Sequence, residues 1–366
     1  MRERSAPSRQ GPPDPARTRL RWAAFAVVVL VLLFFGLREH WLDGRFRWDA
    51  FAAGFSGLEW QWILAALACS LAAYFGRALR WRVMLRPLDP SARIWPIFKA
   101  TAIGFSAVVL LGRPGEFVRP YLISLKERVP FSSQLAAWLL ERICDLLAVA
   151  LVFGFAISRI WSSRAALGPA LRWVLEAGGW VVMALSLVCL ALLIMMGRFP
   201  DVVRRRLLAA LSLLPHRFHL RAEHAVASFM DGTASTTSKG SAWLLILYTA
   251  VEWLLVAAGF GCMFRAYSVT EAFTAIDVFI FMGFIAFGSV LQIPGVGGGL
   301  QLVAIVVLTQ IFGLTIEVAT SIAIMAWIIT FVAIVPIGLW FAYQEGLNWR
   351  RFRDLERSAI REAGQP

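Results

Sequence analysis

The amino-acid sequence predicts an all-α polytopic membrane protein with about six full transmembrane helices and two re-entrant, or broken, helical hairpins. Two observations support this fold class. Of the 366 residues, 59% are hydrophobic and only 16% are charged, whereas soluble domains contain about 25% charged residues. The apolar residues also gather into long stretches, two of which are broken by Gly and Pro. The composition excludes a soluble globular enzyme, a disordered chain and a disulfide-rich secreted protein.

Six stretches are long and apolar enough to cross a bilayer, which requires about 20 residues at a rise of about 1.5 Å each. They are Trp22–Leu37, Trp60–Phe75, Leu135–Ile157, Ala177–Met196, Trp243–Phe264 and Val318–Tyr343. The first follows a basic tail and has no small-residue cleavage site after Gly36, so we interpret it as an uncleaved anchor. We expect a disordered basic tail over 1–20, a membrane domain over 21–343 and a second basic tail over 344–366.

Two further apolar stretches are interrupted. Phe98–Gly112 runs directly into Arg113-Pro114-Gly115-Glu116, and Ile276–Ile293 is broken by Pro294–Gly299 before the chain resumes as Leu300–Phe312. Half-length helices cannot face lipid, because their free backbone groups would lack hydrogen-bond partners there. We therefore predict that both stretches form hairpins that are buried in protein or line a wet cavity.

The distribution of arginine predicts the orientation of the spans. Cytoplasmic loops are enriched in Lys and Arg, and the two tails and the loop Gly197–Gly240 are basic. The segment after Phe75 is basic too, with Arg77, Arg80, Arg82, Arg86 and Arg93. This map puts both termini in the cytoplasm of a cell (inner) membrane, although a loop with Arg159, Arg164 and Arg172 disagrees with it. The first hairpin then enters from the cytoplasm and the second from outside, as in inverted-repeat transporters.

The net charge of +13 does not indicate a nucleic-acid partner. A basic soluble domain would suggest one, but here the arginines flank apolar spans, where they attract anionic lipid headgroups. The four cysteines form no C-x-x-C motif and lie in apolar stretches. We therefore predict no metal and no cofactor.

Charged residues within the span Leu135–Ile157 are the first candidate site. Glu141 and Asp145 are four residues apart and share a helix face, while Arg142 and Asp145 are three apart and can pair. Ionisable groups inside a span cost at least a few kcal/mol each, so they usually have a function. The alternative is a structural ion pair that ties two helices together.

The first interruption supplies a second candidate site. Arg113, Glu116 and Arg119 are spaced three apart and would form one stripe on a helix. Two guanidinium groups could hold a phosphate, and Glu116 could set its orientation or meet a cationic headgroup. The alternative is a ladder of charges at the membrane interface.

The glycine-rich interruption is the third candidate, with Pro294, Gly295, Gly297, Gly298 and Gly299 as its predicted binding residues. It lacks the Lys-Ser/Thr of a nucleotide-binding loop. Its backbone N–H groups could converge on an anion at the start of the next helix, or the glycines could simply allow close helix packing. Glu252, alone in its span, could pair with a buried arginine or act as a proton-linked acid.

These motifs resemble the transmembrane, flippase-like domain of lysylphosphatidylglycerol synthases. The resemblance rests on Gly112–Glu116 with Arg119-Pro120-Tyr121, on Glu141-Arg142-x-x-Asp145, and on Pro294–Gly299, in that order. In full-length synthases this domain looks to be the part that translocates the aminoacylated lipid. Only 23 residues follow Tyr343, so we expect a stand-alone domain without the aminoacyl-transfer part.

The leading functional hypothesis is a lipid translocator that moves an anionic or aminoacylated phospholipid, or a lipid-linked precursor, between leaflets. Anionic membrane lipids are its expected partners, and a homo-oligomer is one option for its assembly. One alternative is a membrane-embedded enzyme that uses Glu141 and Asp145 on a lipid headgroup, although no nucleophile–base pair is evident. Another is a non-catalytic partner of a lipid synthase.

Overall fold

The computed structural model describes residues 46–162, 169–211, 226–230, 239–288, 292–293 and 297–346. The chain divides into two units, residues 1–50 and 51–366, and the account below concerns the second. Helix α2, Trp48–Ser56, crosses the boundary between them. The predicted span Trp22–Leu37, the tail 1–20 and all but residues 344–346 of the tail 344–366 lie outside the described residues.

The described part of the second unit is built almost entirely from helices, which confirms the predicted all-α membrane fold. The long helices are α3 (Trp60–Leu85), α4 (Ile94–Leu111), α6 (Phe131–Ser162), α7 (Pro169–Arg198) and α10 (Lys239–Arg265). The shorter elements are the 3-10 turn η1 (Arg113–Phe117), α5 (Val118–Glu127), α8 (Pro200–Leu211), the 3-10 turn η4 (Ser268–Thr270), α11 (Ala275–Gly288), β1 (Gln292–Ile293), β2 (Gly297–Gly298), α12 (Gly299–Gln310), α13 (Ile316–Trp327), the π-helical turn η5 (Ile328–Val332) and α14 (Ile334–Gln344).

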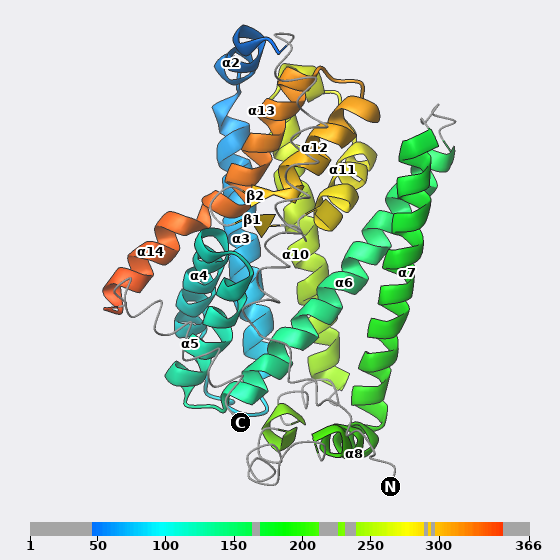
Figure 1. Ribbon diagram of the computed structural model, residues 1–366. Coiled ribbons are helices and arrows are strands. Elements are labelled where there is room, and N and C mark those ends of the chain that lie inside the picture. The colour runs from blue at the N-terminus through cyan, green and yellow to red at the C-terminus, as the bar shows by residue number, and fades with distance from the viewer. Residues whose placement is uncertain are drawn as a thin grey trace, which may run out of the picture. The chain divides into compact units, whose positions relative to one another are not determined.

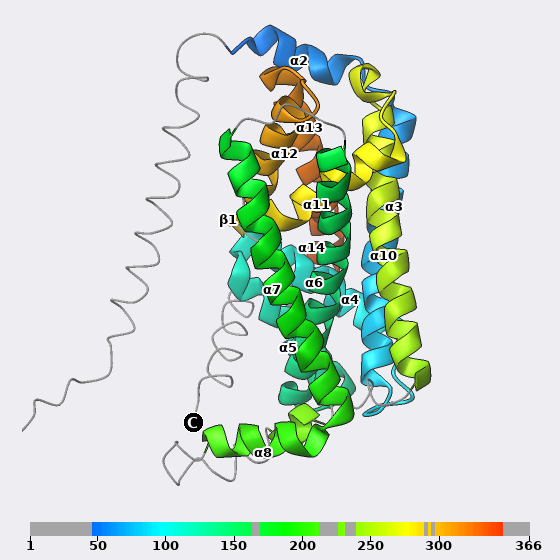
Figure 2. The same cartoon turned by 90° about the vertical axis from the view of Figure 1, so that its right-hand side faces the viewer.

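Four described stretches are long and apolar enough to cross a membrane: Trp60–Leu85, Ile94–Leu111, Gly240–Arg265 and Ile316–Gln344. Helices α6 and α7 have 32 and 30 residues, and at about 1.5 Å per residue each exceeds the hydrocarbon thickness. Helices α3 and α10 lie side by side along their length, and α6 runs from the lower end, beside α5, up to α11 (Figures 1 and 2). The predicted spans within the described residues therefore all correspond to helices.

Two helix boundaries differ from the prediction. Helix α3 continues ten residues beyond Phe75 to Leu85, so that Arg77 and Arg80 lie within the helix and not in a loop. The predicted span Val318–Tyr343 is also not one regular α-helix, because η5 interrupts it. The carbonyl oxygens of Ile329 and Thr330 there accept hydrogen bonds from Ser70 Oγ (2.8 Å) and Tyr74 Oη (2.6 Å) of α3, which satisfies the irregular backbone.

The first interruption forms a helical hairpin of α4, η1 and α5. Gly112 ends α4 with φ of 75° and ψ of −149°, a conformation that favours glycine. Gly115 at the tip packs so closely on α4 that an added Cβ would lie 2.4 Å from the carbonyl oxygen of Ala107. The hairpin is therefore held by backbone contact, as the prediction of a buried broken element requires.

The second interruption forms a hairpin of α11, the β1–β2 pair and α12. Gln292 pairs with Gly298 and Ile293 with Gly297 in antiparallel register. Figure 1 shows α4 and α5 rising from the lower end to mid-height, and α11 and α12 descending from the upper end to the same level. The two hairpins thus enter from opposite ends of the bundle and reach the same level near its middle (Figure 1).

The core consists of two hydrophobic clusters. One gathers side chains of α10, α11, α12 and α13, among them Phe260, Phe281 and Leu300. The other gathers side chains of α3, α4, α5 and α6, among them Trp81 and Ile103. Each hairpin is packed into one of the two clusters.

Candidate functional site

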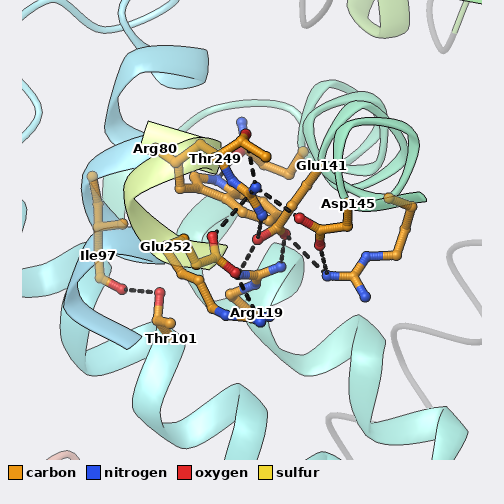
Figure 3. A network of polar contacts seen from close by, with 12 residues as sticks. Arg80, Ile97, Thr101, Arg119, Glu141, Asp145, Thr249 and Glu252 are labelled. Carbon is orange, nitrogen blue, oxygen red and sulfur yellow. Dashed lines mark hydrogen bonds and ion pairs between the residues drawn. The ribbon is translucent and has the colours of Figure 1, made fainter. Parts of the chain in front are cut away.

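A network of buried charges connects four helices, and we call it the charge cluster (Figure 3). Its members are Arg77 and Arg80 from α3, Arg119 from α5, Glu141, Arg142 and Asp145 from α6, and Glu252 from α10. Helix α6 places its three members on one face by their spacing of three and four residues. Glu141 lies ten residues after Phe131, the first residue of α6, so the cluster is about 15 Å from the start of that helix.

Arg80 occupies the centre of the charge cluster. Its guanidinium group lies 2.8 Å from Glu141 Oε1 and 2.7 Å from Asp145 Oδ1. It also donates to Thr249 Oγ1 at 3.1 Å, and the side chain is 1% exposed. Both terminal nitrogens of this buried arginine therefore meet acceptors, which offsets much of the cost of burying its charge. Arg80 therefore ties α3 to both α6 and α10.

Arg119 brings the first hairpin into the charge cluster. Its two terminal nitrogens contact both carboxylate oxygens of Glu141, with Nη1 at 3.2 Å from Oε1. The guanidinium carbon lies 4.1 Å from the ring centroid of Trp81, in the range of a cation–π contact. Gly104 of α4 makes room for this side chain, because a Cβ there would lie 2.5 Å from Arg119 Cβ.

Glu252 pairs with two arginines of α3. Its oxygens lie 2.8 Å from Arg77 Nη2 and 3.3 Å from Arg80 Nη1, and its side chain is 1% exposed. Arg77 in turn lies over the ring of Phe105, at 4.8 Å from the centroid. Of the two interpretations that the sequence left open for Glu252, the structure shows pairing with buried arginines.

A cavity of about 410 Å³ opens between the two hairpins, next to the charge cluster. Its charged lining consists of Arg77, Arg113, Glu116, Arg119, Arg142 and Asp145. The apolar lining includes Phe260 of α10, Met282 and Ile285 of α11, Leu300 of α12 and Phe331 of η5. Charged groups and hydrocarbon therefore meet in one space, as an amphiphilic ligand would require.

Residues 21–338 match the protein family described as the lysylphosphatidylglycerol synthase TM region. The chain belongs to this family. No curated protein and no solved structure matches the chain. The family assignment confirms the resemblance carried by the three sequence motifs and supports a multi-pass membrane protein related to lipids.

Five of the candidate site residues predicted from the sequence line the cavity: Arg113, Glu116, Arg119, Arg142 and Asp145. Arg113 and Glu116 pair with each other at 2.8 Å, and the Arg113 side chain is 53% exposed. Glu141 lies behind the cavity wall, fully buried between Arg80 and Arg119. The structure thus brings the first two candidate sites together.

The glycine-rich candidate is described only in part, because Pro294 and Gly295 lie outside the described residues. Gly297 and Gly298 form β2, and Gly299 begins α12. The N–H of Gly298 donates to Gln301 Oε1 at 2.8 Å, so this donor of the predicted anion site already has an acceptor. Leu300, the next residue along, lines the cavity.

Sequence reasoning missed Arg77 and Arg80 as members of the site, because arginines that follow an apolar stretch indicate the cytoplasmic side of the membrane. Two signals could have found them. They are three residues apart and so share a helix face, and the three carboxylates at Glu141, Asp145 and Glu252 need more cations than Arg142 can supply. Their positions in the fold follow from α3 packing against α6 and α10.

Proposed function

We propose that this member of the family is a lipid translocator, which moves an anionic or aminoacylated phospholipid or a lipid-linked precursor between the leaflets of the cell (inner) membrane. The observation that carries the proposal is the cavity lined by both hairpins, in which arginines and apolar side chains share one space. A lipid needs a polar path for its headgroup while its tails stay in hydrocarbon, and this cavity offers both surfaces.

Arginine is well suited to the polar wall. Its planar guanidinium group has five donors and holds phosphate oxygens in a fork geometry. Within the charge cluster each guanidinium group already faces a carboxylate, which keeps it charged and fixed in position. The remaining donors can then bind a phosphate with little loss of side-chain entropy.

The opposite sense of the two hairpins supports alternating access to the cavity. Broken helices of opposite orientation are typical of transporters whose binding site lies near the midplane, and the α4–α5 and α11–α12 hairpins reach mid-height from opposite ends (Figure 1). We propose that the end with the loop 86–93 is cytoplasmic, because basic residues gather there. The sequence contains no nucleotide-binding loop, so transport would be downhill or coupled to an ion.

The contacts of Glu141 and Asp145 disfavour an enzyme that uses them as acid and base. Glu141 contacts Arg80 and Arg119, and Asp145 contacts Arg80 and Arg142. A carboxylate held by two guanidinium groups is a poor proton acceptor, because protonation would break both ion pairs.

Reconstitution tests the proposed function directly. The purified protein is placed in vesicles with a fluorescent anionic phospholipid, and movement between leaflets is followed by quenching of the outer leaflet. We expect wild-type protein to accelerate the movement and Arg113→Ala to slow it by about tenfold, the effect of about 1.4 kcal/mol. If wild-type protein moves no labelled lipid, the proposal is wrong.

Arg86→Ala is the matched control, because Arg86 is an exposed arginine at the end of α3 that does not line the cavity. It should move lipid at the wild-type rate. A protein that moves no lipid but copurifies with a lipid synthase would instead be a non-catalytic partner of that enzyme.

A further inference from the structure

The charge cluster carries one more positive than negative charge. Four guanidinium groups, those of Arg77, Arg80, Arg119 and Arg142, face three carboxylates. Each carboxylate lies within 2.8 Å of a guanidinium nitrogen, so all three are counted as ionised. Among the residues that the structure describes, the cluster therefore has a net charge of +1.

An excess charge at this depth is costly. A buried charge without a counterion loses several kcal/mol of solvation, and arginine cannot give up its proton to avoid the cost. Three of the four arginines line the cavity, so the excess charge faces the space where a ligand would sit. A single negative charge on the ligand would neutralise the cluster.

Two buried donors at the same cavity lack an acceptor among the described residues. They are Arg142 Nε on α6 and the indole Nε1 of Trp253 on α10, and both side chains line the cavity. A buried donor without a partner costs about 1–3 kcal/mol. Both nitrogens have almost no exposed surface, so a ligand in the cavity reaches them only if the side chains move. The arginines that line the cavity are its accessible donors, and phosphate oxygens are the acceptors that match guanidinium groups.

We propose that the cavity selects a lipid whose headgroup carries one net negative charge, namely a phosphodiester without an amine, and that the arginines lining the cavity donate to its non-ester oxygens. This inference rests on the proposed function and narrows its substrate class. A zwitterionic or aminoacylated headgroup would bring an ammonium group against the arginines. A diphosphate would bring more negative charge than the cluster can neutralise.

Equilibrium binding tests the inference separately from transport. Purified full-length protein in zwitterionic nanodiscs is titrated with two fluorescent lipids of identical tails, phosphatidylglycerol (one negative charge) and phosphatidylethanolamine (zwitterionic). We expect phosphatidylglycerol to bind at least about tenfold more tightly. Equal binding would overturn the inference and leave the proposed function standing, whereas binding of neither lipid would overturn both.

Two variants that replace a charged side chain with glutamine shift the charge of the cluster in opposite directions. Arg142→Gln removes one positive charge and should abolish the preference for phosphatidylglycerol over phosphatidylethanolamine. Glu252→Gln removes one negative charge and should shift the preference by about tenfold towards phosphatidic acid, whose phosphomonoester can carry two charges. General damage to the fold would weaken the binding of all lipids alike and leave the selectivity unchanged. A shift of selectivity in the same direction in both variants would overturn the inference.

A soluble diester separates a lipid headgroup from a free phosphodiester. Dimethyl phosphate presents the same anionic group without tails. We expect it not to displace labelled phosphatidylglycerol at millimolar concentration, because the apolar wall contributes to lipid binding. Displacement as efficient as that by unlabelled phosphatidylglycerol would overturn the assignment to a lipid.

Discussion

Arg80 and Glu141 form a fully buried ion pair at 2.8 Å, with side chains that are 1% and 0% exposed. The pair connects α3 to α6, and each partner has a second contact, Arg80 with Asp145 and Glu141 with Arg119. The helices that surround the cavity are therefore joined by a continuous chain of charges and not by isolated pairs.

We expect Arg80→Gln to destabilise the protein strongly. Removing one partner of a buried ion pair costs about 3–5 kcal/mol, because the other partner stays buried without its counterion. Thermal unfolding in detergent, followed by loss of monodisperse protein, measures the effect. Arg142→Gln is the comparison, since its side chain is 36% exposed and its loss should cost less. Equal losses would contradict the central role of Arg80.

Gly104→Ala should destabilise the first hairpin by about 1–3 kcal/mol, the usual cost of overpacking. The added Cβ would lie 2.5 Å from Arg119 Cβ and 3.1 Å from its Cα, so α5 must move away from α4. The same measurement should show no loss for Gly154→Ala in α6, where nothing lies within 4 Å of the new Cβ and alanine is the better helix former.

Arg119→Lys should slow lipid movement by about tenfold although the charge is kept. Lysine cannot contact both oxygens of Glu141 as a fork and cannot stack on Trp81 in the same way. The quenching assay in vesicles measures the rate, and Arg86→Lys, at an exposed position, should match the wild-type protein. A wild-type rate for Arg119→Lys would show that only its charge matters.

Single cysteines at the bases of the two hairpins should react from opposite sides of the membrane. Ser91 precedes α4 and Glu271 precedes α11, and both are exposed. In a background without the four native cysteines, an impermeant thiol reagent added to right-side-out vesicles should label Glu271→Cys and spare Ser91→Cys. A permeant reagent should label both. Labelling of both sites by the impermeant reagent would contradict the opposite entry of the hairpins.

Much of the fold could be predicted from local sequence. Long apolar stretches specify spanning helices wherever the chain meets lipid, and Gly112 and the Pro294–Gly299 run predicted both interruptions. The extension of α3 to Leu85 could not be seen in this way. Arginines after Phe75 look like a loop by hydropathy, and only their carboxylate partners on α6 and α10 make a buried helix possible there.

The sequence also does not predict the interruption at Ile328–Val332. Its residues are apolar except Thr330 and include neither Gly nor Pro, so the local pattern favours a continuous helix. The π turn exists because Ser70 and Tyr74 of α3 supply donors for its freed carbonyls. Such a contact depends on a helix more than 250 residues away in the chain, as the hydrogen-bond separations of 259 and 256 residues show.

The sequence by itself determined that the chain is a helical membrane protein, where its hairpins break, and that its membrane-embedded charges are concentrated in a few motifs. Each of these follows from local composition, because lipid tolerates only apolar helices and penalises every charge. Only the tertiary structure decided which charges neutralise one another and which of them face the cavity. Ion pairing acts over a few ångströms in space, and residues from α3, α5, α6 and α10 reach that range only once the helices have packed.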